Sequence, residues 1–489
     1  MAARSSWPLL ATGIGLLLAG CASTTPDPQT VLRQADQALG ASQLKTLQFS
    51  GRGSGATFGQ AWQPEIGWPQ LNYSVLTRTL DYDKGALREE FGRSRAEEKG
   101  GGGIPLLGQG EQRATGFVLG EHAWNTTPTG PVAAPVTVDA RIHDLWTTPH
   151  GAIKAAQRHG ATTGTRSDGG QSYSTFSYRV PGRLDATAWV DAQGQITRID
   201  SRQPHPVMGD TEVTTLYSDY RAFGAIRFPM RIRQSQGGHP VFDLQVQDVQ
   251  PNAAVDIALP DNVRTATERV LSEQVAPGVW FLFGGSHNSV AIEMSNHVVL
   301  VEAPLYEGRT AAVFAEVRKL LPTKPIRTVI NSHHHFDHAG GLRAAAAEGA
   351  ALVTSQAAKP YFERVFAKPQ QIRPDRLAQS GRSPEILGVT TRRQFVDGDL
   401  RFEVHEIQGS VHAQGFLMVY LPKEKLLIEA DAYTPAAPNS GPPPVPNANH
   451  VNLVQNIERL GLQVERILPL HGRVVPIGEL YAGIGRARP

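Results

Sequence analysis

The sequence predicts a chain of two parts, a mainly β N-terminal half followed by an α/β C-terminal half. Three observations support this prediction. The length of 489 residues exceeds what one hydrophobic core usually organises. The 49 glycines and 35 prolines are typical of turn-rich β structure rather than of helical bundles. Near Arg264 the pattern changes from alternating, strand-like runs to strand-like and helix-like runs that follow one another.

The first twenty residues have the pattern of an export signal. Arg4 supplies a positive charge, and the apolar stretch at 7–18 is too short for a membrane-spanning helix. The segment ends in the letters LAGC, which resembles the lipobox of bacterial lipoproteins. This resemblance implies that 1–20 is a signal peptide and that Cys21 is lipidated and anchors the chain to a membrane. Ala22 then implies an outer-membrane address facing the periplasm, while an uncleaved signal anchor remains the alternative.

Cysteine usage and charge limit the chemistry and the partners. Cys21 is the only cysteine, so neither a disulfide within the chain nor thiolate metal ligands are possible. A metal would have to be held by His, Asp and Glu, which suits zinc, iron or manganese. With 47 Lys and Arg against 45 Asp and Glu, the chain lacks a field for holding nucleic acid, so no nucleic-acid partner is predicted. The oligomeric state stays unknown at this stage.

Residues 30–263, after a polar tether at 21–29, are predicted to form the N-terminal domain. A helix is predicted at 30–39, with Thr30 as its N-cap and Gly40 as its stop. Alternating runs punctuated by Gly and Asp then predict antiparallel strands. A helix followed by a long meander resembles the lipoprotein-carrier (LolA-like) half-barrels of envelope proteins, and a generic β-rich accessory domain is the alternative.

Two features of this half are assigned no functional role. The glycine-rich run at 96–112 lacks the Lys-Ser/Thr ending and the strand-to-helix context of a phosphate loop, so a flexible loop is predicted. The histidines of this half show no ligand spacing, and they are His122, His143, His150, His159, His205 and His239. The predicted site therefore lies outside the N-terminal half.

Residues 264–489 are predicted to form the C-terminal domain. Strand-like runs occupy 279–284, 289–294, 297–303 and 327–332, and an amphipathic helix-like run occupies 309–321. Strand and helix patterns that follow one another in this way are typical of an α/β domain.

The letters SHHHFDHAGG after the last of these strands contain the pattern HxHxDH. In an extended segment alternate side chains point the same way, so His333, His335 and Asp337 are predicted to converge while His334 points away. His338, where a helix-like run begins, can approach a second metal ion. Imidazole and carboxylate hold zinc at about 2.0 to 2.2 Å, and paired metals lie about 3.5 to 4 Å apart. For this motif alone, a histidine-rich loop without metal is the alternative.

Three further residues follow the motif at the ends of predicted strands. They are His412 before a strand, Asp431 after a strand and His471 after the apolar run RILPL. Each alone is more readily an ordinary loop or strand-end residue. Taken together with HxHxDH, they give a specific order of candidate ligands.

This order resembles the metallo-β-lactamase superfamily over roughly 270–478. The resemblance implies a four-layer αββα sandwich and two divalent metal ions, with zinc the expected metal and iron or manganese as alternatives. It implies the following ligand set: His333, His335 and His412 for the first metal, Asp337, His338 and His471 for the second, and Asp431 between them. The sequence departs from the usual pattern at Glu302, which ends an early strand, and at the triplet before His412, and neither departure removes a ligand.

The resemblance also implies an activity. An all-His/Asp ligand set is closer to glyoxalase II and lactonase-type hydrolases than to cysteine-using β-lactamases. Two metals would lower the pKa of a water towards about 7, and the metal-bridging hydroxide would attack an ester, thioester or lactone-type carbonyl. Asp337 and Asp431 would help to place it, and Tyr433 is a candidate donor to a substrate oxygen. The substrate is expected to be a small molecule.

Several alternatives stay open. The protein could be a β-lactamase, an iron-dependent oxidoreductase of the sulfur dioxygenase type, or a non-enzymatic envelope lipoprotein. His287 is predicted to be a loop histidine without a role, although it could line the pocket. The proline-rich run at 435–447 is predicted to be a loop that contacts substrate, with a plain connector as the alternative.

Overall fold

A thirteen-stranded antiparallel sheet dominates the N-terminal half of the computed structural model. The structure describes residues 27–97, 100–103, 110–438, 441 and 443–487. The predicted signal peptide, Cys21 and most of the tether lie outside these residues. No helix in the described part of the chain is long and apolar enough to cross a membrane.

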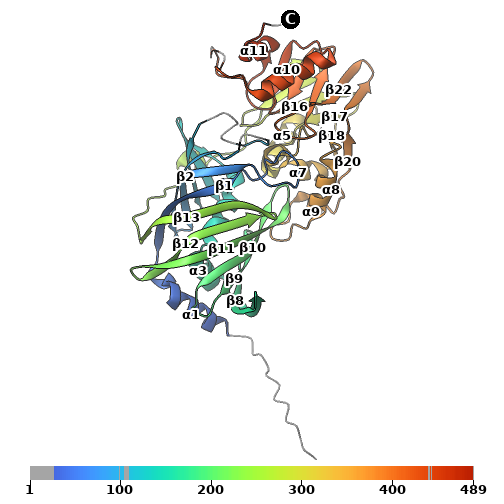
Figure 1. Ribbon diagram of the computed structural model, residues 1–489. Coiled ribbons are helices and arrows are strands. Elements are labelled where there is room, and N and C mark those ends of the chain that lie inside the picture. Colours follow the sequence, from blue (N-terminus) through green and yellow to red (C-terminus); the bar gives the residue numbers. More distant parts are fainter. Residues whose placement is uncertain (1–26, 98–99, 104–109, 439–440, 442, 488–489) are drawn as a thin grey trace, which may run out of the picture.

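In this sheet β1 lies between β2 and β13 (Figure 1). The order of the strands ends with β6 on one side and β7 on the other. Its strands are β1 (Thr46–Ala56), β2 (Gln70–Asp81), β3 (Ala86–Arg95), β4 (Gln112–Leu119), β5 (His122–Thr127), β6 (Gly130–Ala133), β7 (Ala161–Asp168), β8 (Gln171–Val180), β9 (Leu184–Val190), β10 (Ile196–His205), β11 (Gly209–Phe223), β12 (Ile226–Gln236) and β13 (His239–Pro251). The prediction of a mainly β N-terminal domain is confirmed. Its likeness to lipoprotein carriers stays a prediction.

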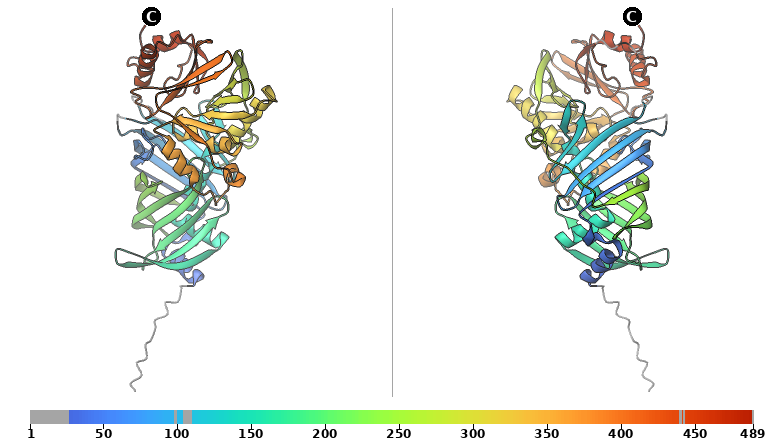
Figure 2. Two further views of the ribbon diagram at one scale, coloured as in Figure 1. Left: turned by 90° about the vertical axis from the view of Figure 1, so that its right-hand side faces the viewer. Right: turned by 90° about the vertical axis from the view of Figure 1, so that its left-hand side faces the viewer.

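Three helices pack against this sheet, which curves around them (Figure 2). They are α1 (Pro28–Leu39), α2 (Val138–Trp146) and α3 (Pro149–His159), and short 3-10 turns lie at Ala41–Gln43 and Pro135–Thr137. Helix α1 begins earlier than predicted, because the Asp27 side chain rather than Thr30 caps it and accepts from the Thr30 amide at 3.1 Å. Gly40, with φ 72°, ends the helix as predicted.

Two sheets form the C-terminal half. The first has seven strands in chain order, β14 (Leu271–Ala276), β15 (Val279–Phe283), β16 (Ser289–Glu293), β17 (Val298–Val301), β18 (Ile326–Ile330), β19 (Ala351–Ser355) and β20 (Ile386–Val389). The second has six, β21 (Arg392–Asp397), β22 (Leu400–Glu406), β23 (Leu417–Leu421), β24 (Leu426–Glu429), β25 (Arg466–Pro469) and β26 (Val475–Pro476). From β17 to β20 neighbouring strands run parallel, and every residue of β17 is buried, as expected for a strand covered on both faces.

Helices cover the outer face of each sheet. The helices of this half are α5 (Glu307–Leu320), α6 (Phe336–Ala339), α7 (Leu342–Ala347), α8 (Lys359–Ala367), α9 (Arg376–Ser380), α10 (Ala448–Leu460) and α11 (Ile477–Gly483). The short helix α4 (Asp261–Arg264) lies between the two halves in the chain and packs against the N-terminal sheet. Val290 and Ile292 of β16 pack between the two sheets, whereas Ala291 packs on the other face with α5, α7 and α8. Helices α10 and α11 pack on the second sheet. The predicted four-layer αββα sandwich is therefore confirmed.

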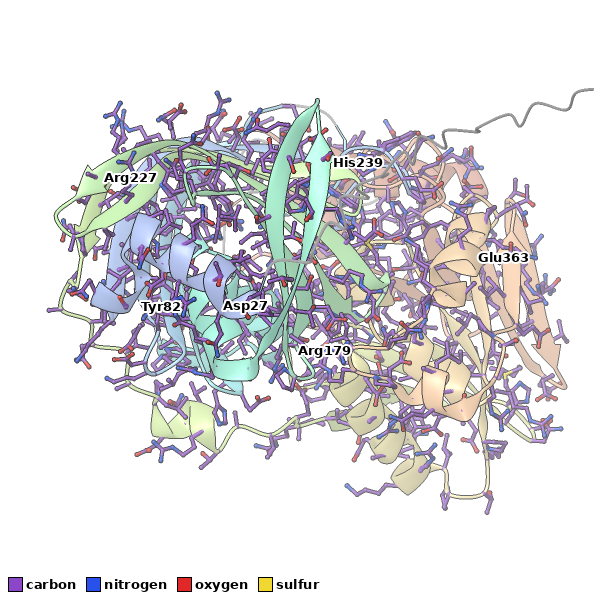
Figure 3. All side chains as sticks on the ribbon, turned by 90° about the horizontal axis from the view of Figure 1, so that it is seen from below. Asp27, Tyr82, Arg179, Arg227, His239 and Glu363 are labelled. Carbon is purple, nitrogen blue, oxygen red and sulfur yellow. The ribbon has the colours of Figure 1, made fainter. Side chains whose placement is uncertain are left out.

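The two halves share one hydrophobic cluster. Ala61, Trp68 and Met208 of the N-terminal half belong to the same buried cluster as Phe336 and the helices α5, α7 and α8. The ring of Trp68 lies 5.7 Å from that of Phe336 and 5.6 Å from that of His239. In the view from below, His239 lies on the side of the sheet towards the C-terminal half, and Arg227 lies at the far side (Figure 3). The predicted boundary between domains at 263/264 falls within α4 and stays a prediction.

Candidate metal centre

The HxHxDH motif lies directly after the central parallel strand β18. His335 is extended, with φ −61° and ψ 146°, and forms the N-terminal boundary of α6. The extended segment therefore ends before Asp337, which lies in the helix. The predicted alternation holds for His333 and His335, whereas Asp337 belongs with His338.

One group of candidate ligands contains His333, His335, His412 and Asp431, whose ligand atoms all lie within 4.8 Å of one another. The Nε2 atom of His333 lies 2.9 Å from Nδ1 of His335 and 3.2 Å from Nε2 of His412. His412 comes from the loop before β23, as predicted. This group contains the three histidines that the resemblance assigned to a first metal.

A second group contains His287, Asp337, His338 and His471 under the same distance limit. Nε2 of His471 lies 3.1 Å from Nε2 of His338. His471 follows β25, at the edge of the sheets where the motif lies. The group combines the three predicted second-metal residues with His287, for which a role was not predicted.

Asp431 joins the two groups. Its Oδ2 lies 2.8 Å from Nε2 of His412, and its Oδ1 lies 2.8 Å from Nε2 of His471. Oδ2 is also 3.3 Å from Nε2 of His338. One carboxylate thus has an oxygen directed at each group, which is the position that the resemblance gave to Asp431.

This donor set fits two divalent metal ions. Ring nitrogens of different histidines face one another at hydrogen-bond distance. A buried group of several imidazole nitrogens and two carboxylates is a typical ligand set for borderline metals such as zinc. His333 and His335 are completely buried, and His412 is 4% exposed. The identity of the metal stays a prediction.

Hydrogen bonds to the Nδ1 atoms of three of these histidines orient their rings. Glu302, fully buried at the end of β17, accepts from Nδ1 of His338 at 2.9 Å and from the Ser332 hydroxyl at 2.6 Å. The Ser332 hydroxyl is also 2.9 Å from Nδ1 of His333. The backbone carbonyl of Ser286 accepts from Nδ1 of His471 at 3.2 Å. Outer hydrogen bonds of this kind fix the tautomer and orientation of metal-binding histidines.

The electrostatics follow from burial and from the mixture of imidazoles and carboxylates. Burial opposes the charged form of His338, but Asp431, Asp337 and Glu302 raise its pKa well above the usual value. Burial also opposes the charge on Asp431, yet His338 and the other histidines hold its pKa well below the usual range. His338 and His287 likewise hold the pKa of Asp337 well below the usual range against the effect of burial. Asp337 and Asp431 are therefore ionised at neutral pH and available as ligands.

His287 is a site residue that sequence reasoning missed. Its Nε2 lies 3.2 Å from Oδ2 of Asp337, and its ring centroid lies 4.1 Å from that of His471. Burial lowers the pKa of His287 to about 4, so its ring is neutral at neutral pH. The available signal was its place in the short loop between β15 and β16, but a lone loop histidine has no characteristic spacing.

Tyr433 follows Asp431 by two residues in the chain, and its side chain belongs to the hydrophobic cluster between the sheets. It is buried, its ring centroid is 4.8 Å from that of His450, and its backbone amide donates to Glu429 at 2.8 Å. Burial raises the pKa of Tyr433 to about 12, so the phenol keeps its proton at neutral pH. Its catalytic role stays a prediction. So does the substrate contact of the loop at 435–447, of which residues 439, 440 and 442 lie outside the described part of the chain.

Residues 282–469 match the family model of the metallo-beta-lactamase superfamily. A relative named 2,4-dinitroanisole O-demethylase subunit alpha, from Nocardioides sp. (strain JS1661), is 26% identical over 202 residues, which cover 41% of this chain and 57% of that protein.

Among solved structures, a metallo-beta-lactamase from Pontibacter korlensis is 16% identical, with a TM-score of 0.35, covering 44% of this chain and 98% of that one. A metallo-beta-lactamase from Hirschia baltica is 20% identical, with a TM-score of 0.33, covering 45% of this chain and 99% of that one.

Proposed function

We propose that the protein is a metal-dependent hydrolase, because residues 282–469 match the family model of the metallo-beta-lactamase superfamily, which the motif resembles. The observation that carries the proposal is the position of Asp431, with one oxygen 2.8 Å from His412 and the other 2.8 Å from His471. A carboxylate placed between two groups of ligands supports a centre of two adjacent metals rather than two independent sites.

The candidate ligands would hold the two metals as follows. His333, His335 and His412 would hold one metal, Asp337, His338 and His471 the other, and Asp431 would contact both. Metals held there supply a water of lowered pKa and an electrophile for a carbonyl oxygen. The ionised carboxylates of Asp337 and Asp431 would accept hydrogen bonds from such a water and so orient it.

Exposure favours entry of the substrate over the second group. The side chains of Asp337 and His471 are 30% and 20% exposed, whereas His333 and His335 are completely buried. Tyr433 and the start of the loop at 435–447 follow Asp431 in the chain, and we propose that they contact the bound substrate. The protonated phenol of Tyr433 would donate to a substrate oxygen or to the leaving group.

We propose an ester, thioester or lactone as the substrate class. The histidine and carboxylate donor set supports this choice, because a thiolate ligand is absent from a chain whose only cysteine is Cys21. A β-lactam is the main alternative. An aryl methyl ether belongs in the test as well, since the Nocardioides relative is named for 2,4-dinitroanisole.

The test is metal content together with a substrate panel. The parent chain, Asp431→Ala and the control Asp168→Ala, which changes an exposed carboxylate of β7, are analysed for metals and assayed on a thioester, a lactone, nitrocefin and 2,4-dinitroanisole. We expect about two zinc ions per chain in the parent and the control, with metal and hydrolysis both lost in Asp431→Ala. Iron without hydrolysis would support the oxidoreductase alternative, and absence of metal would refute the proposal.

We also propose that Cys21 carries a lipid that anchors the chain in the cell envelope, with the outer membrane as the expected location. The support is the LAGC sequence after an apolar stretch. Expression with labelled fatty acid should label the parent and leave Cys21→Ser unlabelled and absent from the membrane fraction. Equal labelling of both chains would contradict the proposal.

A further inference from the structure

A loop of the N-terminal half lies on the metal centre. It comprises residues 57–69, between β1 and β2, and is called the β1–β2 loop here. Its Gly59 carbonyl accepts from the Phe336 amide at 3.2 Å, and its Trp62 carbonyl accepts from the Gln414 amide at 2.7 Å. The Trp62 indole donates to the Ser410 carbonyl at 3.0 Å. The loop is thus hydrogen-bonded to both segments that carry the three histidines of the first group.

The loop fixes the orientation of His335. The Ala61 carbonyl is 2.9 Å from Nε2 of His335 and 2.8 Å from Nε2 of His334. A carbonyl only accepts, so both rings must carry their proton on Nε2. Nδ1 of His335 is then unprotonated and faces Nε2 of His333 at 2.9 Å, as a metal ligand must.

The loop also reaches Asp337 of the second group. Nε2 of Gln60 donates to Oδ1 of Asp337 at 2.8 Å. The other oxygen, Oδ2, lies 3.2 Å from Nε2 of His287 and 3.8 Å from Nε2 of His338. Gln60 therefore occupies one oxygen of the carboxylate and leaves the other directed towards the second group.

A glycine segment from the same half supports the loop. The Gly102 amide donates to the Gln60 carbonyl at 2.9 Å, and Arg95 donates to the Gly102 carbonyl at 2.6 Å. A Cβ atom on Gly102 would lie 2.7 Å from Cε1 of His412 and 3.0 Å from Cε1 of His335. Residues 100–103 are therefore pressed against two ligands, whereas 98–99 and 104–109 of the predicted flexible loop lie outside the described residues.

Aromatic packing holds the β1–β2 loop in place. The ring centroid of Phe336, the residue between His335 and Asp337, lies 5.2 Å from that of Phe58 and 4.7 Å from that of His205. The ring of Trp68 completes this contact. A loop packed in this way is preorganised, so its hydrogen bonds to the ligands require little ordering when metal binds.

From these contacts we propose that the N-terminal half supplies an outer layer of the metal centre, in which Gln60 is a positioning residue for Asp337 and the second metal. The inference rests on the proposed two-metal function. It assigns the N-terminal half a role in holding metal, beyond attachment to a membrane. Loss of an outer hydrogen bond of this kind typically lowers metal affinity about 10- to 100-fold.

The test is stepwise titration of the metal-free full chain with Co²⁺, read from the visible absorption of each bound ion. Gln60→Ala and Gln60→Met are compared with the parent, because Met keeps the length of the side chain and lacks the donor. Gln70→Ala is the matched control, since Gln70 directly follows the loop as the first residue of β2 and its side-chain amide donates to the Trp68 carbonyl. We expect both Gln60 variants to bind the second Co²⁺ about 10- to 100-fold more weakly, with the first ion and the control unchanged.

The outcomes separate the two proposals. Parental affinity for the second ion in both Gln60 variants would overturn the role of Gln60 while leaving the metal centre intact. A loss in Gln60→Ala that Gln60→Met restores would show that packing rather than the hydrogen bond matters, and would also overturn it. A parent that binds no Co²⁺ would refute the proposed function and this inference together.

Discussion

Replacing Glu302 with alanine tests whether the buried carboxylate that accepts from Nδ1 of His338 stabilises the fold and the proposed metal centre. In the parent, Glu302 accepts from the His338 ring, the Ser332 hydroxyl and the Asn331 amide, at 2.9, 2.6 and 3.1 Å. It is completely buried, so these donors lose their acceptor in a place where water enters with difficulty.

The size of the effect follows from these donors, to which the Ser332 backbone amide adds a fourth at 3.3 Å. Each buried donor left without a partner costs about 1 to 3 kcal/mol, and a water molecule in the vacated space offsets part of the sum. We therefore expect the free energy of unfolding of the metal-free chain to fall by about 3 kcal/mol or more. Because Nδ1 of His338 is released, zinc affinity should also fall about 10- to 100-fold.

Urea unfolding of the chelator-treated chain, followed by tryptophan fluorescence, measures the first effect without the contribution of bound metal. Competition with a chelating dye measures the second. Glu293→Ala is the control, since Glu293 lies on the neighbouring strand β16 and pairs with Lys324 at a partly exposed position. A Glu302→Ala chain that matches this control in both measurements would refute the reasoning.

Three further predictions follow from the site and its surroundings. Gly102→Ala should weaken zinc binding and increase proteolysis of the β1–β2 loop, because the new methyl group meets His412 and His335; unchanged binding in a dye competition would contradict the contact. Tyr433→Phe should lower kcat and leave zinc content unchanged if the phenol donates to substrate, whereas an unchanged kcat would limit Tyr433 to packing. Burial lowers the pKa of His205 to about 3, whereas a histidine in the unfolded chain has a pKa of about 6.5. As pH falls from about 6.5 to about 3, the unfolded chain binds a proton at His205 and the folded chain does not, so the free energy of unfolding decreases. From pH 7 to pH 5 the loss should be about 2 kcal/mol, and His205→Asn, which keeps an acceptor for the Val207 and Met208 amides, should lose less over the same interval in urea unfolding.

The grouping of the candidate ligands in the C-terminal half was predictable because their pattern is local in sequence. HxHxDH places His333 and His335 on one side of an extended segment, and this pattern survives folding. Asp431 and His471 were visible as polar residues that follow apolar runs, and His412 as a polar residue that precedes one. Alternation failed at Asp337 because α6 begins at Phe336, and the start of a four-residue helix leaves little trace in a sequence.

The contribution of the N-terminal half was not predictable from the sequence. Gln60 and Asp337 are separated by 277 positions, and nothing in the letters around Gln60 indicates a partner so far away. The glycine run at 100–103 was visible, but its composition indicates only a loop, and the need for glycine at Gly102 arises from histidines of the other half. Tertiary contacts of this kind depend on how two separately formed sheets meet.

β1 lies inside its sheet, between β2 and β13, and this position limits the order in which the N-terminal half can fold. β1 pairs with β2 and with β13, whose residues reach Pro251, so the β1–β2 loop has a fixed base only after the chain has been made to that point. A domain made first generally folds first. We therefore expect the surface that receives His335 and Asp337 to form first, the C-terminal half to fold against it, and metal to bind last.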